Sequence, residues 1–195
     1  MVASLFRMPD HDGKIYLSDV CLSELNLQEA RSALTAIPQD PLFFTGTLRS
    51  NRDPFGEYGD QEIWDALDKV QMKELLENIP DKLDCHVTER GKNFSVGERQ
   101  LLCLARAMLQ KKKVLVFDEA TANIDYDTER LIHDTLKDQL KDCTVLTIAH
   151  RMTNVMQYDK VLVLDKGRLV EFDKPGVLIN RKDSIFARLV SSTTT

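Results

Sequence analysis

The sequence predicts an α/β fold with a mostly parallel sheet, on three observations. Residues 114–117 form a continuous β-branched and aromatic run, typical of a strand buried on both faces of a parallel sheet. Residues 144–149 form a second apolar strand, and the stretch 130–140 between them is an amphipathic helix. This order of strand, helix and strand favours a right-handed crossover between parallel strands.

The first half of the chain is richer in loops, and its elements are short. Asp12-Gly13 is a turn signal before a strand, and Pro38 stops the next strand. Apolar residues with helical spacing, among them Ile63 and Leu67, predict a helix, and Ile79-Pro80 ends the one after it. The expected elements of this half are a helix at 2–6, strands at 14–17 and 34–37, and helices at 60–70 and 72–76.

The second half is more regular. Ser95 opens a helix, and the buried strands described above follow it. Residues 161–171 predict a hairpin around Asp165-Lys166-Gly167-Arg168, and only residues 191–195 are low in complexity. The expected apolar face of the Ser95 helix consists of Leu101, Leu102, Leu104, Ala105, Met108 and Leu109.

The composition excludes several classes of protein. The chain has 195 residues and a formal net charge of −5, without the excess of Lys and Arg that marks a nucleic-acid surface. Hydrophobic residues make up 43%, which is ordinary for a globular domain, and no apolar run approaches the ~20 residues of a membrane span. The four cysteines are scattered without a CxxC pair, which argues against a zinc site or a disulfide framework.

Two acids follow the strand at 114–117 directly. Ligands of open α/β sheets bind at the carboxyl ends of strands, so Asp118 can hold Mg²⁺, directly or through water. Glu119 can then polarise a water aimed at a γ-phosphate. The alternative interpretation is a pair of solvated acids at the end of a strand.

Ser95 and Glu98 have the spacing of a capping box at the start of a helix. Gly97 permits close approach, and the helix N-terminus presents N–H groups to an anion. A cap and a phosphate site use the same end of a helix, so the two interpretations are compatible.

Two further polar residues stand beside predicted strands. His150 follows the strand at 144–149 and can donate a hydrogen bond to a phosphate oxygen, although a lone histidine there is more often structural. Gln39 lies on a loop between Pro38 and Pro41, where its amide could contact Mg²⁺ or an attacking water. Alone, a glutamine in such a loop would indicate nothing.

Taken in their order along the chain, the segments that contain Gln39, Ser95, Asp118 and His150 resemble the nucleotide-binding domain of ATP-binding-cassette (ABC) transporters. The resemblance covers nearly the whole chain. Residues 37–41, 93–100 and 161–172 look most like the multidrug-resistance-associated (C) subfamily, and Glu119 favours its second cassette, because the first often lacks this glutamate. The matches are Gln39 to the Q-loop, 94–100 to the signature motif, 114–118 to Walker B, Glu119 to the catalytic glutamate, 122–125 to the D-loop and His150 to the switch histidine.

The resemblance implies a P-loop NTPase-like cassette fragment over residues 1–195. It assigns a helical signature subdomain to about 55–110, a core from Walker B to the hairpin to 111–175, and a C-terminal helix and tail to 176–195. The signature departs from Leu-Ser-Gly-Gly-Gln at Phe94, Val96 and Glu98, and the Glu98 carboxylate conflicts with a triphosphate unless Arg99 or a neighbour offsets it.

The implied activity is ATP hydrolysis coupled to export, with ATP as substrate and Mg²⁺ as cofactor. The implied partners are a second ABC nucleotide-binding domain, packed head to tail, and transmembrane domains, with no nucleic acid; the implied place is the cytoplasmic face of a membrane. The implied roles are catalysis for Glu119, His150 and Gln39, Mg²⁺ binding for Asp118 and Gln39, contact with the partner's ATP for Ser95, Gly97 and Glu98, and the D-loop for Asp125.

No GxxxxGK[ST] P-loop occurs in the 195 residues, so the resemblance also implies an N-terminally truncated cassette. Losing three charge-assisted hydrogen bonds of about 1.5–3 kcal/mol each lowers ATP affinity about 10³- to 10⁶-fold, so we expect this chain alone to be catalytically deficient. We also expect the missing strand to leave the strand at 114–117 with an unpaired edge. The alternatives are a non-catalytic or trans-complementing interaction fragment, and half of a chromosome-maintenance ATPase, which the absence of heptads and the net charge disfavour.

Overall fold

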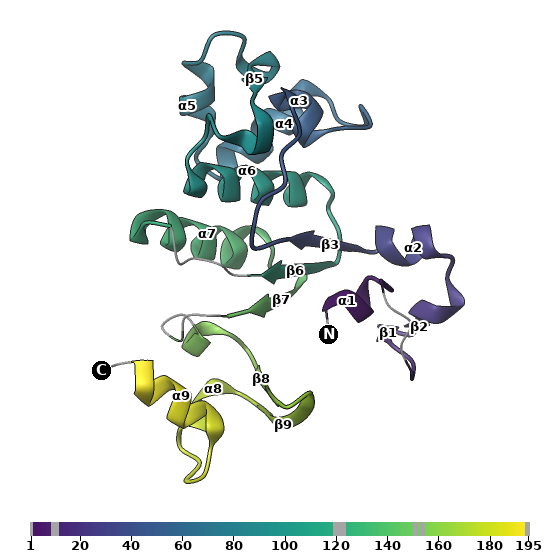
Figure 1. Ribbon diagram of the computed structural model, residues 1–195, viewed down its shortest axis with the longest axis vertical. Helices are drawn as coiled ribbons and strands as arrows, with labels where there is room; N and C mark the ends of the chain where they lie inside the picture. Colours follow the sequence, from purple (N-terminus) through teal and green to yellow (C-terminus); the bar gives the residue numbers. More distant parts are fainter. Residues whose placement is uncertain (1, 9–11, 119–123, 150–151, 153–154, 194–195) are drawn as a thin grey trace. The chain divides into compact units, whose positions relative to one another are not determined.

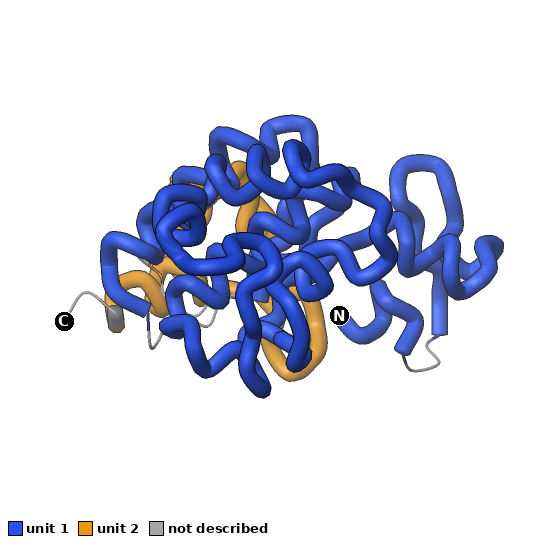
Figure 2. The backbone as a smooth tube through the Cα atoms, turned by 90° about the horizontal axis from the view of Figure 1, so that it is seen from above, with its two compact units in different colours: residues 1–148 blue, residues 149–195 orange. Residues whose placement is uncertain are grey.

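The fold is taken from a computed structural model of the 195-residue chain, which describes residues 2–8, 12–118, 124–149, 152 and 155–193. The predicted roles of Glu119 and His150, and the first two residues of the D-loop match, lie outside the described residues. The chain divides into two compact units, Met1–Ile148 and Ala149–Thr195 (Figure 2). Each unit is described by itself below.

A three-stranded parallel sheet is the centre of the first unit (Figure 1). Its strands are β3 (Leu34–Ile37), β6 (Val114–Asp118) and β7 (Thr144–Ile148), in the order β3-β6-β7. The β-branched and aromatic run of β6 is almost fully buried, with Leu115, Val116 and Phe117 at most 2% exposed. The α/β class and the parallel sheet are therefore confirmed.

The expectation that β6 has an unpaired edge is wrong. β6 pairs with β3 on one side and with β7 on the other, both in parallel. The outer strands of this described sheet are β3, which is mostly buried, and β7, whose residues are half-buried except for the exposed Thr144. The strand predicted at 144–149 forms, but the prediction that it is buried is wrong, because β7 is covered less completely than β3, on which α2 and α6 pack.

Two long helices flank this sheet. α6 (Val96–Leu109) begins at the N-cap Ser95 and packs on β3 and on α7 (Tyr126–Gln139), and all six residues of its predicted apolar face are buried. α7 joins β6 to β7 and starts four residues before the predicted helix, because the Asp125 side chain accepts a hydrogen bond from Thr128 N and caps it.

A helical layer packs on the other side of α6 (Figure 1). The predicted helices at 60–70 and 72–76 are confirmed, and Ile63 and Leu67 are fully buried. The elements of this layer are β4 (Gly46–Thr47), α3 (Leu48–Arg52), α4 (Asp60–Lys69), α5 (Lys73–Glu77), η2 (Lys82–Asp84), β5 (His86–Val87) and η3 (Glu89–Gly91), with β4 and β5 antiparallel.

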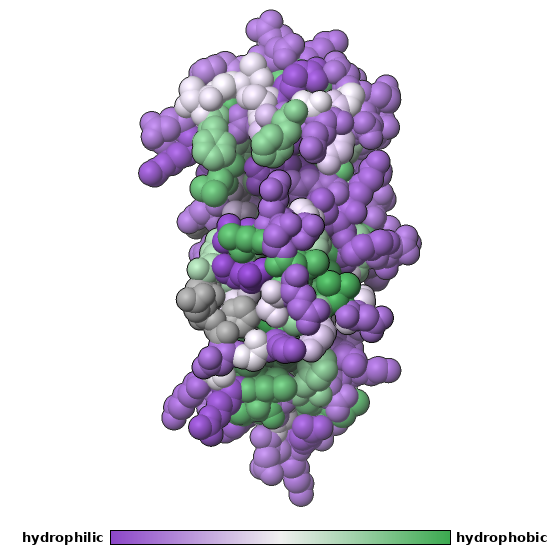
Figure 3. Space-filling view, turned by 90° about the vertical axis from the view of Figure 1, so that its right-hand side faces the viewer, coloured by the Kyte–Doolittle hydropathy of each residue, from purple (hydrophilic) through white to green (hydrophobic). Residues whose placement is uncertain are grey.

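Three aromatic and aliphatic side chains of this unit are exposed beside the helical layer. Leu42, Phe44 and Phe55 are 63%, 71% and 84% exposed, the first two in the loop after Gln39 and the third in the loop after α3. Figure 3 shows apolar side chains at the surface in the upper part of the molecule, in the region of α3 and α4. Exposed large apolar groups that gather in this way favour an interaction surface.

The N-terminal part of the first unit is held by arginine side chains. Arg7 donates to the carbonyl oxygens of Leu22 and Leu25, and Arg31 donates to that of Phe6. The strand expected at 14–17 is reduced to two residues in a small hairpin. The elements of this part are α1 (Val2–Leu5), β1 (Tyr16–Leu17), β2 (Val20–Cys21), η1 (Leu22–Glu24) and α2 (Leu27–Ser32).

The second unit contains the predicted hairpin and short helices. β8 (Val161–Asp165) and β9 (Arg168–Asp173) are antiparallel, and Lys166 and Gly167 both have positive φ, as a tight two-residue hairpin turn requires. The other elements are η5 (Val155–Gln157), α8 (Pro175–Ile179) and α9 (Ile185–Thr193), and the small core consists of Val155, Val163, Leu178 and Phe186.

Every described helix of the two units is too short or too polar to span a bilayer. All four cysteines are free, and three of them, Cys21, Cys85 and Cys103, are buried.

Glu171 of β9 fixes the start of α9. Its carboxylate accepts hydrogen bonds from Ile185 N, Phe186 N and the Ser184 hydroxyl, at 3.0, 2.9 and 3.2 Å. Burial would raise the pKa of Glu171, but these donors, with the nearby charge of Arg181, hold the pKa below its usual value. The charged carboxylate therefore stabilises the folded second unit.

We predict that this contribution depends on pH. Because the pKa of Glu171 is lower in the folded state, its charged carboxylate stabilises the fold at pH values above the ordinary pKa of 4.5. This stabilisation is lost as the pH falls through the pKa of the folded state. The difference in unfolding free energy between the wild type and Glu171→Gln should thus be larger at pH 7 than at about pH 3, measured by urea denaturation. Asp165→Asn, at the exposed end of the same hairpin, controls for net charge, and a difference that does not change with pH would contradict the prediction.

Arg52 is a buried charge in the helical layer of the first unit. It is 1% exposed, and its Nη1 donates to the carbonyl oxygen of Leu102, while Nε and Nη2 have no hydrogen-bond partner among the described residues. The Phe43 ring lies 4.7 Å from its Cζ atom. Burial lowers the pKa of Arg52 to about 10, so it is still charged at neutral pH.

Replacing Arg52 by leucine should stabilise the chain. The desolvation penalty of a buried charge with unmet hydrogen bonds exceeds the stabilisation that its contacts provide. We therefore expect Arg52→Leu to raise the unfolding free energy by about 1–3 kcal/mol. Thermal denaturation checks this, with Arg49→Leu as the matched control, because Arg49 pairs with Asp60 near the surface at 2.8 Å and its loss should cost less than about 1 kcal/mol. A lower melting temperature for Arg52→Leu would refute the prediction.

Candidate functional site

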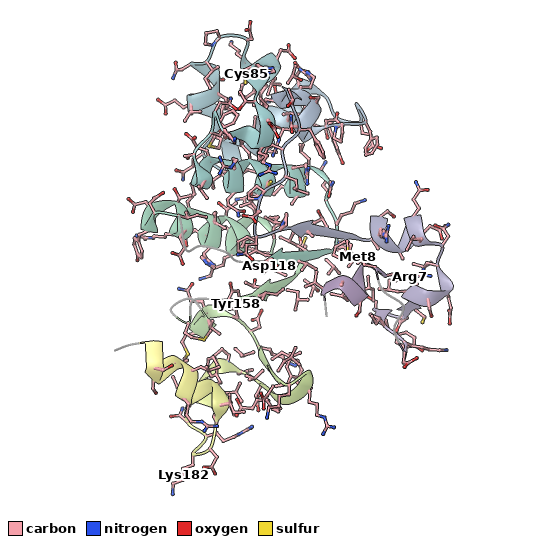
Figure 4. The ribbon with its side chains drawn as sticks, in the orientation of Figure 1. Arg7, Met8, Cys85, Asp118, Tyr158 and Lys182 are labelled. Atoms are coloured by element: carbon pink, nitrogen blue, oxygen red, sulfur yellow. The ribbon has the colours of Figure 1, made fainter. Side chains whose placement is uncertain are left out.

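The carboxyl ends of the three parallel strands meet at one edge of the sheet. Ile37 of β3 lies opposite Phe117 of β6, and Asp118 of β6 lies opposite Ile148 of β7. Gln39 follows β3 by two residues, and Asp118 is the last residue of β6, where Figure 4 shows it at the tip of the strand beside α7. The structure therefore brings Gln39 and Asp118 to the same edge of the sheet.

The chemistry of these two side chains suits Mg²⁺. Asp118 is half-buried and offers carboxylate oxygens, and Gln39 is exposed and offers an amide oxygen. Mg²⁺ prefers oxygen ligands, and it is usually held by one or two protein groups, with water and substrate phosphates completing its octahedron. A larger cluster of His, Cys, Asp or Glu side chains is not found in the part of the chain that the structure describes.

The capping box predicted at Ser95 is confirmed. Ser95 Oγ accepts from Glu98 N at 3.2 Å, and Glu98 Oε2 accepts from Ser95 N at 2.7 Å. The first bond of the helix runs from Arg99 N to Ser95 O, so the N–H groups of Val96 and Gly97 have no acceptor within α6. Together with the helix dipole, these groups can attract an anion.

The Glu98 carboxylate is therefore turned back onto its own helix cap. The Arg99 guanidinium donates to the carbonyl oxygens of Phe94 at 2.7 Å and Gly91 at 3.4 Å. The neighbour that engages Glu98 is the backbone N–H of Ser95.

Gly97 lies against Thr128 of α7, a residue that the sequence analysis does not identify. A Cβ atom on Gly97 would come within 2.8 Å of Thr128 Cγ2. Thr128 in turn donates to Asp125 from its N at 2.9 Å and from its Oγ1 at 2.8 Å, and these hydrogen bonds lower the pKa of Asp125. Thr128 thus joins Asp125 to Gly97.

Gln100 is the last residue of the segment matched to the signature motif, and the sequence alone gives its side chain no role. Its side chain reaches from α6 to the loop of Gln39, where Nε2 donates to the backbone carbonyl oxygen at 2.8 Å. The sequence signal for Thr128 is its N-cap spacing from Asp125, whereas nothing local indicates Gln100, because its partner lies 61 residues away.

A family profile described as "ABC transporter" matches residues 2–122. The chain is 47% identical over 190 residues to human "ATP-binding cassette sub-family C member 4". This alignment covers 97% of the chain and 14% of the relative. It is 48% identical over 189 residues to "Multidrug resistance protein mrp-7" of Caenorhabditis elegans, covering 96% of this chain and 12% of the relative.

A solved structure described as a bacterial Atm1-family ABC exporter with ATP bound superposes with a TM-score of 0.91 at 30% identity. The match covers 100% of this chain and 34% of that chain. The chain thus spans about a seventh of the length of the human relative, at 14%.

We predict that the contact between Gly97 and Thr128 limits substitution at the signature segment. Gly97→Ala should lower the unfolding free energy by about 1–3 kcal/mol, because Thr128 is held by Asp125 and cannot turn away from the new methyl group. Thr128→Ser removes Cγ2 and keeps the hydroxyl bond to Asp125, so the double variant should recover that stability in thermal denaturation. Thr128→Ser alone is the matched control. A double variant no more stable than Gly97→Ala would show that the contact is not the cause.

Proposed function

The chain belongs to the ABC transporter family, and from that membership we propose that it binds Mg²⁺ and ATP as part of the nucleotide-binding machinery of a C-subfamily exporter. The observation that carries the proposal is the common edge of the sheet, to which the parallel register of β3, β6 and β7 brings Gln39 and Asp118. Ligands of open α/β sheets bind at such an edge.

In this proposal each residue has a defined task. Asp118 and Gln39 hold Mg²⁺, which neutralises charge on the phosphates when it is bound. Glu119 orients or deprotonates the attacking water, and His150 donates a hydrogen bond to the γ-phosphate. These last two tasks follow from the sequence positions directly after Asp118 and two residues after Ile148.

The N-terminus of α6 serves a second ATP, bound mainly by a partner. Ser95 and the free N–H groups of Val96 and Gly97 contact its phosphates, and Glu98 borders them with its carboxylate held on the cap. Asp125 positions the D-loop through Thr128. The partner is a second ABC nucleotide-binding domain that packs head to tail on this chain.

These 195 residues contain no GxxxxGK[ST] segment. A helix N-terminus and two oxygen ligands replace only part of a phosphate-binding loop, so the chain alone binds ATP weakly and hydrolyses it negligibly. In the proposed head-to-tail pair, the N-terminus of α6 faces the P-loop of the partner.

The exposed side chains of Leu42, Phe44 and Phe55 form the contact with the transmembrane domains, at the cytoplasmic face of the membrane. Two of them lie in the loop that Gln39 begins, so a partner bound there contacts the same loop as the nucleotide site. The length of the relatives, of which the chain spans 14% in the human case, leaves room for such domains.

The composite site can be tested by adding the chain to a separate ABC nucleotide-binding domain that carries a P-loop. The chain should tighten ATP binding by that domain, measured with a fluorescent ATP analogue and Mg²⁺. Ser95→Asp keeps the N-cap but places a negative charge against the phosphates, so it should abolish most of this gain, about tenfold in affinity or more.

Two variants control for cap and charge. Ser95→Thr retains both the cap and the hydroxyl and should act like the wild type, and so should Thr47→Asp, which adds the same charge at the N-cap of α3. If no version of the chain changes the ATP affinity of the partner, the proposed function is wrong.

A further inference from the structure

Gln100 is a buried polar residue on the helix that carries the signature segment. It is 3% exposed and lies five residues after Ser95, which is about 7.5 Å along the helix axis. Its Nε2 donates to the backbone oxygen of Gln39 at 2.8 Å. The side chain therefore connects the two parts of the candidate site that come from different elements.

The orientation of the amide is fixed by this contact. A carbonyl oxygen accepts only a donor, so the amide nitrogen must face Gln39 and the amide oxygen must point away from it. Oε1 is buried and has no hydrogen-bond partner within the described ranges. Leaving an acceptor unpaired in this way costs about 1–3 kcal/mol.

The bond to Gln39 thus brings little net stability. An apolar side chain of similar size would fill the same space without an unpaired oxygen. What an apolar side chain cannot do is hold the backbone of Gln39 at a set distance from α6, and this loop carries one of the two Mg²⁺ candidates.

We infer that Gln100 is a positioning residue, which couples the loop of Gln39 to the nucleotide-contacting first turn of α6. Its function rests on the proposed composite site, because it acts through Gln39 at the sheet edge and through Ser95 at the cap. A shift of the Gln39 backbone is transmitted to α6 through a single hydrogen bond and one and a half turns of helix.

The coupling can be measured on the full chain without nucleotide. The amides of Glu98 and Arg99 report on the cap, because they donate to Ser95 Oγ and Ser95 O. Gln39→Gly loosens the loop, and in the wild-type background it should speed hydrogen exchange at these two amides about fivefold, the lower end of usual coupling. In the Gln100→Met background the same change should have no such effect.

Gln110 provides the matched control. It lies at the opposite end of the same helix, and its Oε1 accepts from Thr35 Oγ1 of β3 at 2.6 Å. In a Gln110→Met background, Gln39→Gly should still speed exchange at the cap as in the wild type. Gln100→Leu repeats the test should Gln100→Met fail to fold.

The proposal is overturned if Gln39→Gly acts equally in the Gln100→Met and Gln110→Met backgrounds, or if it has no effect on the cap of the wild type. Because no nucleotide is present, this result is independent of the composite-site test. If Gln39→Gly speeds exchange at the cap only when Gln100 is present, but the chain does not change the ATP affinity of the partner domain, Gln100 still joins the loop to the cap. That result would refute only the proposed function.

Discussion

The pairing of β6 with a parallel strand on each side is the constraint on which the candidate site depends. Parallel strands end at the same edge, so this register alone brings the carboxyl ends of β3, β6 and β7 together, although the strands are far apart in the sequence. A shift of one residue between β3 and β6 would move Gln39 relative to Asp118 and exchange the faces to which successive side chains of β6 point, so that each would have to pack among different neighbours. The deep burial of Leu115, Val116 and Phe117 opposes such a shift.

α6 fixes the position of the signature segment relative to the sheet. Gln110 at its end bonds Thr35 of β3, Gln100 bonds the loop that follows β3, and Gly97 lies against α7. The helix is thus held at three points along its length, each by a different neighbour. The Ser95 cap at its first turn, which we propose contacts phosphate, is therefore positioned by the same sheet that presents Asp118.

The elements that the sequence predicts well are those with a local signature. The apolar run of β6, the apolar face of α6 and the Ser95 capping box each depend on residues within one or two turns, and all are confirmed. The two-residue strands β2, β4 and β5 are too short to show a period, and the neighbours of β6 were predicted wrongly because pairing order is a long-range property. Thr128 and Gln100 matter through contacts with other elements, which no local spacing records.

The closure of β3 onto β6 also bears on how the chain acquires its fold. Residues 38–113, which include the whole helical layer, lie between the two strands. β3 therefore leaves the ribosome long before its partner does, and at about 5–20 residues per second it waits for several seconds. During that interval the layer can collapse first and shorten the loop that remains to be closed, which lowers the entropic barrier to forming the sheet.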